Sequence, residues 1–246
     1  MEDFSKRTFD FRNGELLLLD KPLTWTSFDV VNKIRYTVKR LVQIKRIKVG
    51  HAGTLDPLAT GLLIICTGKM TKQIDSFTGM PKEYTGTFKL GEETSSYDRE
   101  TEVSATYDIS NISEEDLETT RKKFLGKIDQ FPPIFSAKKI KGKKAYEYAR
   151  KNEKVEIKSN QIEIFEFELT KIDLPHVEFR VVCSKGTYIR SLAYDFGKTL
   201  NNGAVLTELR RTKIGDYKIE DAYNVKEFSE YLQSQDPVDE QKRDNI

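Results

Sequence analysis

Short apolar segments alternate irregularly with helix-like segments along this chain, and this order constrains the fold more than any other feature. Residues 15–20, 62–66 and 162–172 have the length and composition of buried strands. Apolar residues at helical spacing instead predict helices over 27–42 and 187–200. Because no regular strand–helix–strand repeat connects these segments, the sequence predicts an α+β fold, with a mixed, mostly antiparallel sheet flanked by helices.

Local signals set further boundaries. Residues 84–90 alternate well enough for a strand, and Ser113 is predicted to cap a helix that runs to Ile128. Ser27 is likewise predicted to cap the first helix. Glycines bracket a loop over residues 50–61.

Composition indicates a folded protein. The 246 residues are 37% hydrophobic and include 14 Phe and 11 Tyr, which are ample for a core. The longest apolar stretches are far shorter than the ~20 residues that span a bilayer, and no apolar signal region begins the chain. We therefore expect a cytoplasmic protein with no membrane partner. Cys66, Cys183, His51 and His176 match no metal-site spacing, so neither a metal nor a disulfide framework is expected.

The predicted domain organisation is simple. One main domain is expected over residues 13–226, after an N-terminal extension at 1–12. Residues 227–246 are polar and are predicted to form a loose tail.

Charge is segregated along the chain. Residues 33–48 hold seven basic side chains and no acidic one, and residues 138–154 hold eight basic and two acidic ones. Residues 92–118 hold ten acidic side chains against a single Arg. Such a distribution can steer a polyanion onto one side of a protein. Ordinary solvated faces would produce the same runs, so both interpretations stay open.

Asp56 lies between Leu55 and Pro57 in the glycine-bracketed loop. Many helices begin with Asp followed by Pro, so helix capping is one interpretation. The other is that the loop presents a single carboxylate, flanked by apolar residues, as a nucleophile or electrostatic stabiliser. No phosphate-binding glycine motif points to a nucleotide cofactor.

Five motifs together resemble the TruB family of bacterial tRNA pseudouridine synthases. They occur in the family's order and cover most of the chain: 20–27, 50–62, 82–84, 183–190 and 209–211. The segment Gly-His-Ala-Gly-Thr-Leu-Asp-Pro-Leu-Ala-Thr-Gly-Leu at 50–62 is the most specific. Thr24 stands where the family's Lys-Pro-x-Gly-x-x-Ser motif has glycine, and the chain ends where many relatives continue into a C-terminal PUA domain.

The resemblance implies a pseudouridine synthase fold and cofactor-independent isomerisation of uridine 55 in the T-loop of tRNA. It implies that Asp56 is the nucleophile, with Arg190 as its charged partner. Because an aromatic face offsets part of the cost of flipping out a base, we expect Tyr84 to stack on the uracil and to act as a catalytic residue. The residues implied to contact substrate are His51, Tyr84, Tyr188, Leu209 and Asp98. The basic residues expected to contact the RNA backbone are Lys45, Arg46, Lys48, Arg210 and Arg211.

Two other functions compete with this one. A guide-RNA-dependent relative shares the loop but normally carries a PUA domain and accessory surfaces. An RNA-binding or RNA-folding module with an inactive site is the other, and the intact set of Asp56, Tyr84 and Arg190 disfavours it. We expect a monomer that acts on the T-arm of tRNA without an obligatory protein partner.

Overall fold

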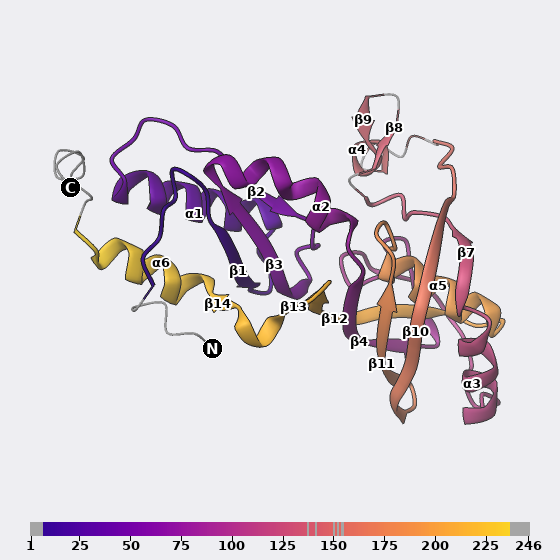
Figure 1. Cartoon of the computed structure of the whole chain (residues 1–246). Coiled ribbons are helices and arrows are strands. Elements are labelled where there is room, and N and C mark those ends of the chain that lie inside the picture. Colours follow the sequence, from indigo (N-terminus) through magenta and orange to yellow (C-terminus); the bar gives the residue numbers. More distant parts are fainter. Residues whose placement is uncertain are drawn as a thin grey trace. The chain divides into compact units, whose positions relative to one another are not determined.

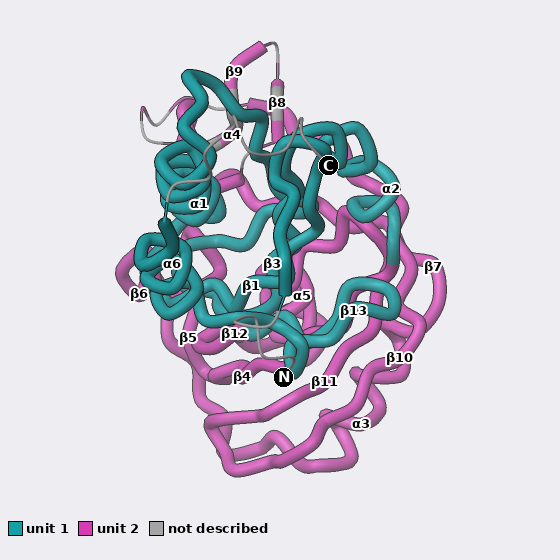
Figure 2. Tube along the Cα trace, turned by 60° about the vertical axis from the view of Figure 1, so that its left-hand side comes forward, with its two compact units in different colours: residues 1–80, 210–246 teal, residues 81–209 magenta. Residues whose placement is uncertain are grey.

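The structure is a computed structural model (Figure 1) that describes residues 7–236 except 137, 141, 150, 152 and 154. The chain forms two compact units, coloured separately in Figure 2. Unit 1 combines residues 1–80 with residues 210–246, and unit 2 is the continuous segment 81–209. The segment predicted as one main domain therefore contributes to both units.

The sheet of unit 1 is built around β1 (Leu16–Lys21), which pairs antiparallel with β3 (Ala59–Thr67) and parallel with β14 (Tyr223–Asn224). On its other side β3 neighbours β12 (Ala204–Ile214), whose residues from Arg210 onward belong to this unit. The remaining elements apart from two helices are β2 (Val49–Ala52), η2 (Gly68–Gln73), α2 (Ile74–Gly79), β13 (Tyr217–Lys218) and η3 (Ile219–Asp221).

Two amphipathic helices, α1 (Ser27–Leu41) and α6 (Val225–Ser234), lie side by side in unit 1. Successive side chains of a strand point to opposite faces, so β1 and β3 supply two apolar layers. The layer that packs against both helices includes Leu17, Leu19, Leu63, Ile65, Val30, Ile34, Phe228 and Leu232. The opposite layer includes Leu62, Ile64, Cys66 and Phe77.

The sheet of unit 2 runs antiparallel in the order β4 (Lys82–Leu90), β11 (His176–Cys183), β10 (Asn160–Asp173) and β7 (Gly126–Gln130), with β12 next to β4. The other elements are β5 (Glu92–Thr94), β6 (Val103–Thr106), α3 (Glu114–Lys122), β8 (Lys139–Ile140), β9 (Lys143–Lys144), α4 (Ala145–Ala149) and α5 (Ile189–Thr199).

A cluster of phenylalanine rings lies in the core of unit 2. Phe196 of α5 packs against Phe88 of β4 and Phe167 of β10, with ring centroids 5.4 and 6.0 Å apart. Phe88 also stacks on Phe179 of β11 at 4.2 Å. These contacts fix α5, whose first turn carries Arg190, against the sheet.

The predicted fold class is confirmed, since a mixed and mostly antiparallel set of strands is flanked by helices. The helix capped by Ser113 is also present, with a capping box to Asp116, but its predicted extension to Ile128 is wrong. The helix ends at Lys122, and Gly126 adopts a φ of 85°. That left-handed conformation favours glycine, and the strand β7 begins there.

Two boundaries in unit 1 also differ from prediction. The N-cap of α1 is Thr26, which forms a capping box with Asp29, so Ser27 is the first helical residue rather than the cap. The loop predicted over residues 50–61 is shorter, because β2 continues to Ala52 and β3 begins at Ala59.

The predicted polar tail is wrong over residues 227–234, which belong to α6. Phe228 and Leu232 are spaced one helical turn apart and are 0% and 2% exposed. Phe11, inside the predicted N-terminal extension, also lies in the unit 1 core. Residues 1–6 and 237–246 lie outside the described residues. Among the described helices, none combines the length and the hydrophobicity that a bilayer crossing requires.

Candidate active site

Asp56 is carried by the short connection between β2 and β3, residues 53–58, which we call the Asp56 loop. Its side chain is half-buried, and its carbonyl accepts a hydrogen bond from the N–H of Ala59 at 3.1 Å. Pro57 and Leu58 form a turn and β3 begins at Ala59, so the helix-capping interpretation is wrong. The interpretation that remains is a carboxylate presented by a loop.

The backbone on both sides of Asp56 is held by α1 and the turn before it. The Ser27 hydroxyl donates to the Leu55 carbonyl at 3.1 Å and accepts from the Leu55 N–H at 2.8 Å. The N–H of Thr24 donates to the Pro57 carbonyl at 2.8 Å. Thr24 has a φ of 69°, so the threonine adopts a left-handed conformation at the position where the TruB motif has glycine.

Arg211 is buried, and the expectation that it contacts RNA phosphates is therefore wrong. Its side chain is 1% exposed, and its guanidinium donates to the carbonyls of Leu62 at 2.7 Å and Gly53 at 3.1 Å. The neighbouring Arg210 is 40% exposed and forms a bidentate ion pair with Asp20 at 2.7 and 3.1 Å. Contact between Arg210 and RNA stays a prediction.

Lys21, at the end of β1, is a buried cation that sequence reasoning did not single out. Its Nζ donates to the carbonyls of Pro22 at 2.9 Å and Trp25 at 2.5 Å. Burial lowers the pKa of Lys21 to about 8, and the negative charge of Asp56 opposes that shift. One feature of the sequence could have pointed to Lys21: the lysine stands at the end of an otherwise mostly apolar strand.

His51 lies on β2 opposite Ile65 and is half-buried. Burial, and then the positive charge of Arg211, lower the pKa of the imidazole, which favours its neutral form. Within the part of the chain that the structure describes, its Nδ1 has no hydrogen-bond partner. A neutral ring offers one donor and one acceptor, which suits contact with a nucleobase.

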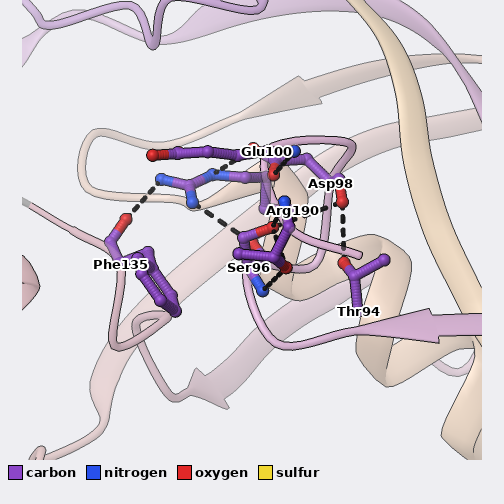
Figure 3. A network of polar contacts seen from close by, with 7 residues as sticks. Thr94, Ser96, Asp98, Glu100, Phe135 and Arg190 are labelled. Carbon is purple, nitrogen blue, oxygen red and sulfur yellow. Dashed lines mark hydrogen bonds and ion pairs between the residues drawn. The ribbon is translucent and has the colours of Figure 1, made fainter. Parts of the chain in front are cut away.

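In unit 2, Arg190 is the centre of a buried polar network (Figure 3). Its Nε lies 3.5 Å from Oδ2 of Asp98, and the two side chains are 5% and 6% exposed. Its two terminal nitrogens donate to the carbonyls of Ser96 at 3.2 Å and Phe135 at 2.9 Å. The guanidinium is thus fixed by one carboxylate and two carbonyls.

Asp98 is itself held by its surroundings. Its Oδ1 accepts from the N–H of Glu100 at 2.9 Å, and its carbonyl accepts from the Thr94 hydroxyl at 2.7 Å. The resemblance placed Asp98 among the substrate contacts, and the structure adds Arg190 as a partner of its carboxylate.

The other predicted substrate contacts in unit 2 lie on well-fixed backbone. Tyr84 is 8% exposed on β4, and Leu209 is half-buried on β12. Tyr188 is the N-cap residue of α5, and the Gln130 side chain binds its backbone on both sides, accepting from its N–H at 2.8 Å and donating to its carbonyl at 3.1 Å. Sequence reasoning missed Gln130, because a lone Gln at a strand end carries no signal of its own.

The predicted site residues divide between the two units. Lys45, Arg46 and Lys48 are exposed on the connection between α1 and β2. Part of the second basic run, Lys141, Arg150 and Lys154, lies outside the described residues. Across the described chain, no group of three or more His, Cys, Asp or Glu side chains is placed to hold a metal ion. Unit 1 carries Asp56, His51, Lys45, Arg46, Lys48, Arg210 and Arg211, and unit 2 carries Tyr84, Asp98, Tyr188, Arg190 and Leu209.

Known proteins resemble this chain in fold and in sequence. The chain resembles a solved Cbf5–Nop10–Gar1 complex, with 28% identity and a TM-score of 0.68 over 96% of this chain and 57% of that one. An archaeal box H/ACA Nop10–Cbf5 complex matches with 26% identity, a TM-score of 0.64 and the same coverage of both chains. The model of the TruB family pseudouridylate synthase N-terminal domain matches residues 39–189, and that of the tRNA pseudouridylate synthase B C-terminal domain matches residues 190–246. The fold is that of a pseudouridine synthase.

Curated relatives narrow this class. The tRNA pseudouridine synthase B of Flavobacterium johnsoniae is 57% identical over 225 residues, which cover 91% of this chain and 98% of the relative. That of Phocaeicola vulgatus is 54% identical and covers 92% and 97%. The chain belongs to the TruB family, and it is an isomerase that converts uridine in tRNA to pseudouridine.

Proposed function

We propose that the chain isomerises uridine 55 in the T-loop of tRNA, with Asp56 as the nucleophile that acts on a flipped-out uridine. The observation that carries the proposal is the backbone-fixed Asp56 loop, which lies within the most specific motif of the sequence. The enzyme acts in the cytoplasm as a monomer, needs no obligatory protein partner and recognises the T-arm.

The reaction makes modest chemical demands. The N1–C1′ bond of uridine breaks, the uracil turns and C5 bonds to C1′. The proton on C5 leaves and N1 takes up a proton, so that product and substrate are isomers. Because no electron is gained or lost, the residues of the chain suffice without a redox cofactor. A carboxylate beside the flipped nucleoside supplies the nucleophile and stabilises the developing charge.

Substrate contacts follow from the need to remove the base from its stack. Flipping costs a few kcal/mol, and an aromatic face offsets part of that. Tyr84 is proposed to stack on the uracil, and His51 to occupy or support the space that the base leaves. Tyr188 and Leu209 complete the proposed contacts.

Arg190 is proposed to pair with the Asp56 carboxylate and to hold it in place while the base covers it. The network around Arg190 supports this role, because a guanidinium held by Asp98 and two carbonyls keeps one orientation. Asp98 then acts through Arg190, as a positioning residue, as well as through any direct substrate contact.

The RNA backbone is proposed to lie along Lys45, Arg46, Lys48 and Arg210. Phosphate contacts of this kind supply affinity and orientation but little sequence information. The three lysine and arginine side chains of the connection between α1 and β2 are exposed, as such contacts require.

The test uses the purified full chain and a T-arm stem-loop tritiated at C5 of uridine 55. The wild-type chain alone is expected to release tritium, and Asp56→Asn is expected to lower the rate by about 10⁴-fold or more with RNA affinity changed less than about threefold. Loss of RNA binding in a folded Asp56→Asn variant would contradict the nucleophile assignment. Charge reversal at Lys45, Arg46 and Lys48 should weaken binding and flatten its salt dependence, and an unchanged salt slope would remove them from the interface.

A further inference from the structure

We propose that Ser27 and Arg211 are positioning residues for the isomerisation: they fix the backbone of the Asp56 loop and thereby aim its carboxylate at the flipped uridine. Neither residue carries this role in the resemblance or in the sequence signals. Ser27 has the appearance of a helix cap, and Arg211 that of a phosphate contact. The inference rests on the proposed role of Asp56.

The Ser27 hydroxyl provides hydrogen-bond partners for the backbone of Leu55, which belongs to no strand or helix. Leu55 is 3% exposed and lies in the coil part of the loop, so its N–H and carbonyl need partners inside the protein. One hydroxyl serves both, accepting from the N–H at 2.8 Å and donating to the carbonyl at 3.1 Å. Because Thr26 performs the capping of α1, the Ser27 side chain is used for the loop. It is itself 2% exposed and thus shielded from competing water.

Arg211 holds the start of the same loop. Its guanidinium joins the Gly53 carbonyl, in the loop, to the Leu62 carbonyl, in β3. A Cβ atom at Gly61 would collide with the Arg211 backbone, so the glycine lets β12 approach β3 closely. Gly61 also has a φ of 106°, which favours glycine. The position of Arg211 is therefore fixed both by the packing of its backbone against Gly61 and by the hydrogen bonds of its side chain.

Together these contacts bracket one residue. Leu55 is held by Ser27 and Pro57 by the Thr24 N–H, and these are the two neighbours of Asp56 in the chain. With both neighbouring peptide groups fixed, the Asp56 side chain retains only its own rotamers. A misplacement of about 1 Å in a reacting group can cost about 100-fold in rate.

The experiment compares Ser27→Ala with Ser229→Ala in the full chain. Ser229 is the matched control: it is also a buried helical serine of unit 1, and its hydroxyl donates to the Val225 carbonyl at 2.6 Å, far from the loop in sequence. Single-turnover tritium release and tRNA affinity are measured for each. Ser27→Ala should lower the rate about 100-fold with affinity unchanged within about threefold, and Ser229→Ala should stay within about twofold of wild type.

Two further readouts separate aiming from mere stability. Ser27→Thr keeps the hydroxyl and should recover most of the rate, and the Leu55 amide should exchange with solvent faster in Ser27→Ala than in Ser229→Ala. Should Ser27→Ala fail to fold, Arg211→Lys serves in its place. Lysine keeps the charge but lacks the planar fork, so one carbonyl contact is lost and a rate about 10-fold lower is expected.

The inference is overturned if Ser27→Ala keeps the wild-type rate, if it loses no more rate than Ser229→Ala, or if its loss lies in tRNA affinity. When Ser27→Ala cannot be used, a wild-type rate for Arg211→Lys overturns it. Asp56→Asn is measured alongside. An inactive Asp56→Asn together with a fully active Ser27→Ala would reject only the positioning role, whereas an active Asp56→Asn would reject the proposed nucleophile and the positioning role together.

Discussion

The two units hold their candidate residues by different means. In unit 1 the Asp56 loop is fixed through its backbone, by a neutral hydroxyl, a backbone N–H and a guanidinium that all bind peptide groups. In unit 2 the functional side chain itself is fixed, because Arg190 is paired with Asp98 and two carbonyls. Changes in shape should therefore affect the first region most, and changes in charge the second.

Removal of the Arg190 charge should give the largest effect on stability. Arg190→Met leaves the Asp98 carboxylate buried without its cation, and such a change costs about 3–5 kcal/mol in free energy of unfolding. Urea unfolding measures it. Arg99→Met is the matched control. Arg99 is 45% exposed and its ion pair with Glu92 is long, at 3.8 Å, so this substitution should lower the free energy of unfolding by under about 1 kcal/mol.

The double variant Asp98→Asn, Arg190→Met sharpens this result. If the cost arises from an unpaired buried charge, neutralising Asp98 should restore part of the lost stability. Equal losses in the single and double variants would show that charge does not hold this region together.

The pH dependence of stability should have opposite signs for a buried group in each unit. In unit 2, burial raises the pKa of Asp195 to about 6 from its ordinary 3.8. Between these values the folded state binds more protons than the unfolded state, so stability falls as pH rises. In unit 1, Lys21 has a pKa of about 8 instead of 10.5. Between those values the unfolded state binds more protons, so stability rises with pH.

Substitutions assign each slope to its residue. Asp195→Asn should remove the fall in the free energy of unfolding between about pH 4 and 6. The fall itself is on the order of 1 kcal/mol, because Asp195 is only half-buried and solvent screens it. Lys21→Met should flatten only the alkaline window. Urea unfolding at pH 4, 6, 8 and 10 measures both, and an Asp195→Asn variant with the wild-type acid slope would refute the first assignment.

The smallest expected effect concerns the turn that supports the Asp56 loop. Thr24→Gly removes the strain of a threonine at φ 69° but adds freedom to the unfolded chain, so a net gain of about 0.5 kcal/mol is expected. Thr8→Gly is the control, since Thr8 is also exposed and outside the helices and strands of unit 1 but does not adopt a positive φ. It should lose about as much as Thr24→Gly gains, and a loss in both would mean that Thr24 is not strained.

Patterns of alternating and helical spacing were enough to predict the fold class and most elements, because they report burial directly. The different roles of neighbouring residues with similar side chains were harder to predict. Thr26 and Ser27 both suit an N-cap, and only the fold shows that the first caps α1 while the second binds Leu55. Arg210 and Arg211 must point to opposite faces of β12, but the sequence does not state which face is buried.

The Asp56 motif was predictable as a local unit, whereas its supports were not. Thr24, Ser27 and Arg211 lie as far as 158 residues from their loop partners in the chain, and nothing in their local sequence links them to the loop. The predicted pairing of Asp56 with Arg190 joins residues of different units and stays a prediction.

Unit 1 is assembled from the two ends of the chain, and this has a consequence for biosynthesis. The ribosome completes the continuous segment 81–209 before it delivers β14 and α6, which pair with β1 and pack against α1. Domains generally fold as units during translation. The nascent chain therefore carries the Asp56 segment with an unfinished apolar surface until the last strand and helix emerge, and unit 2 is the first part able to reach its native state.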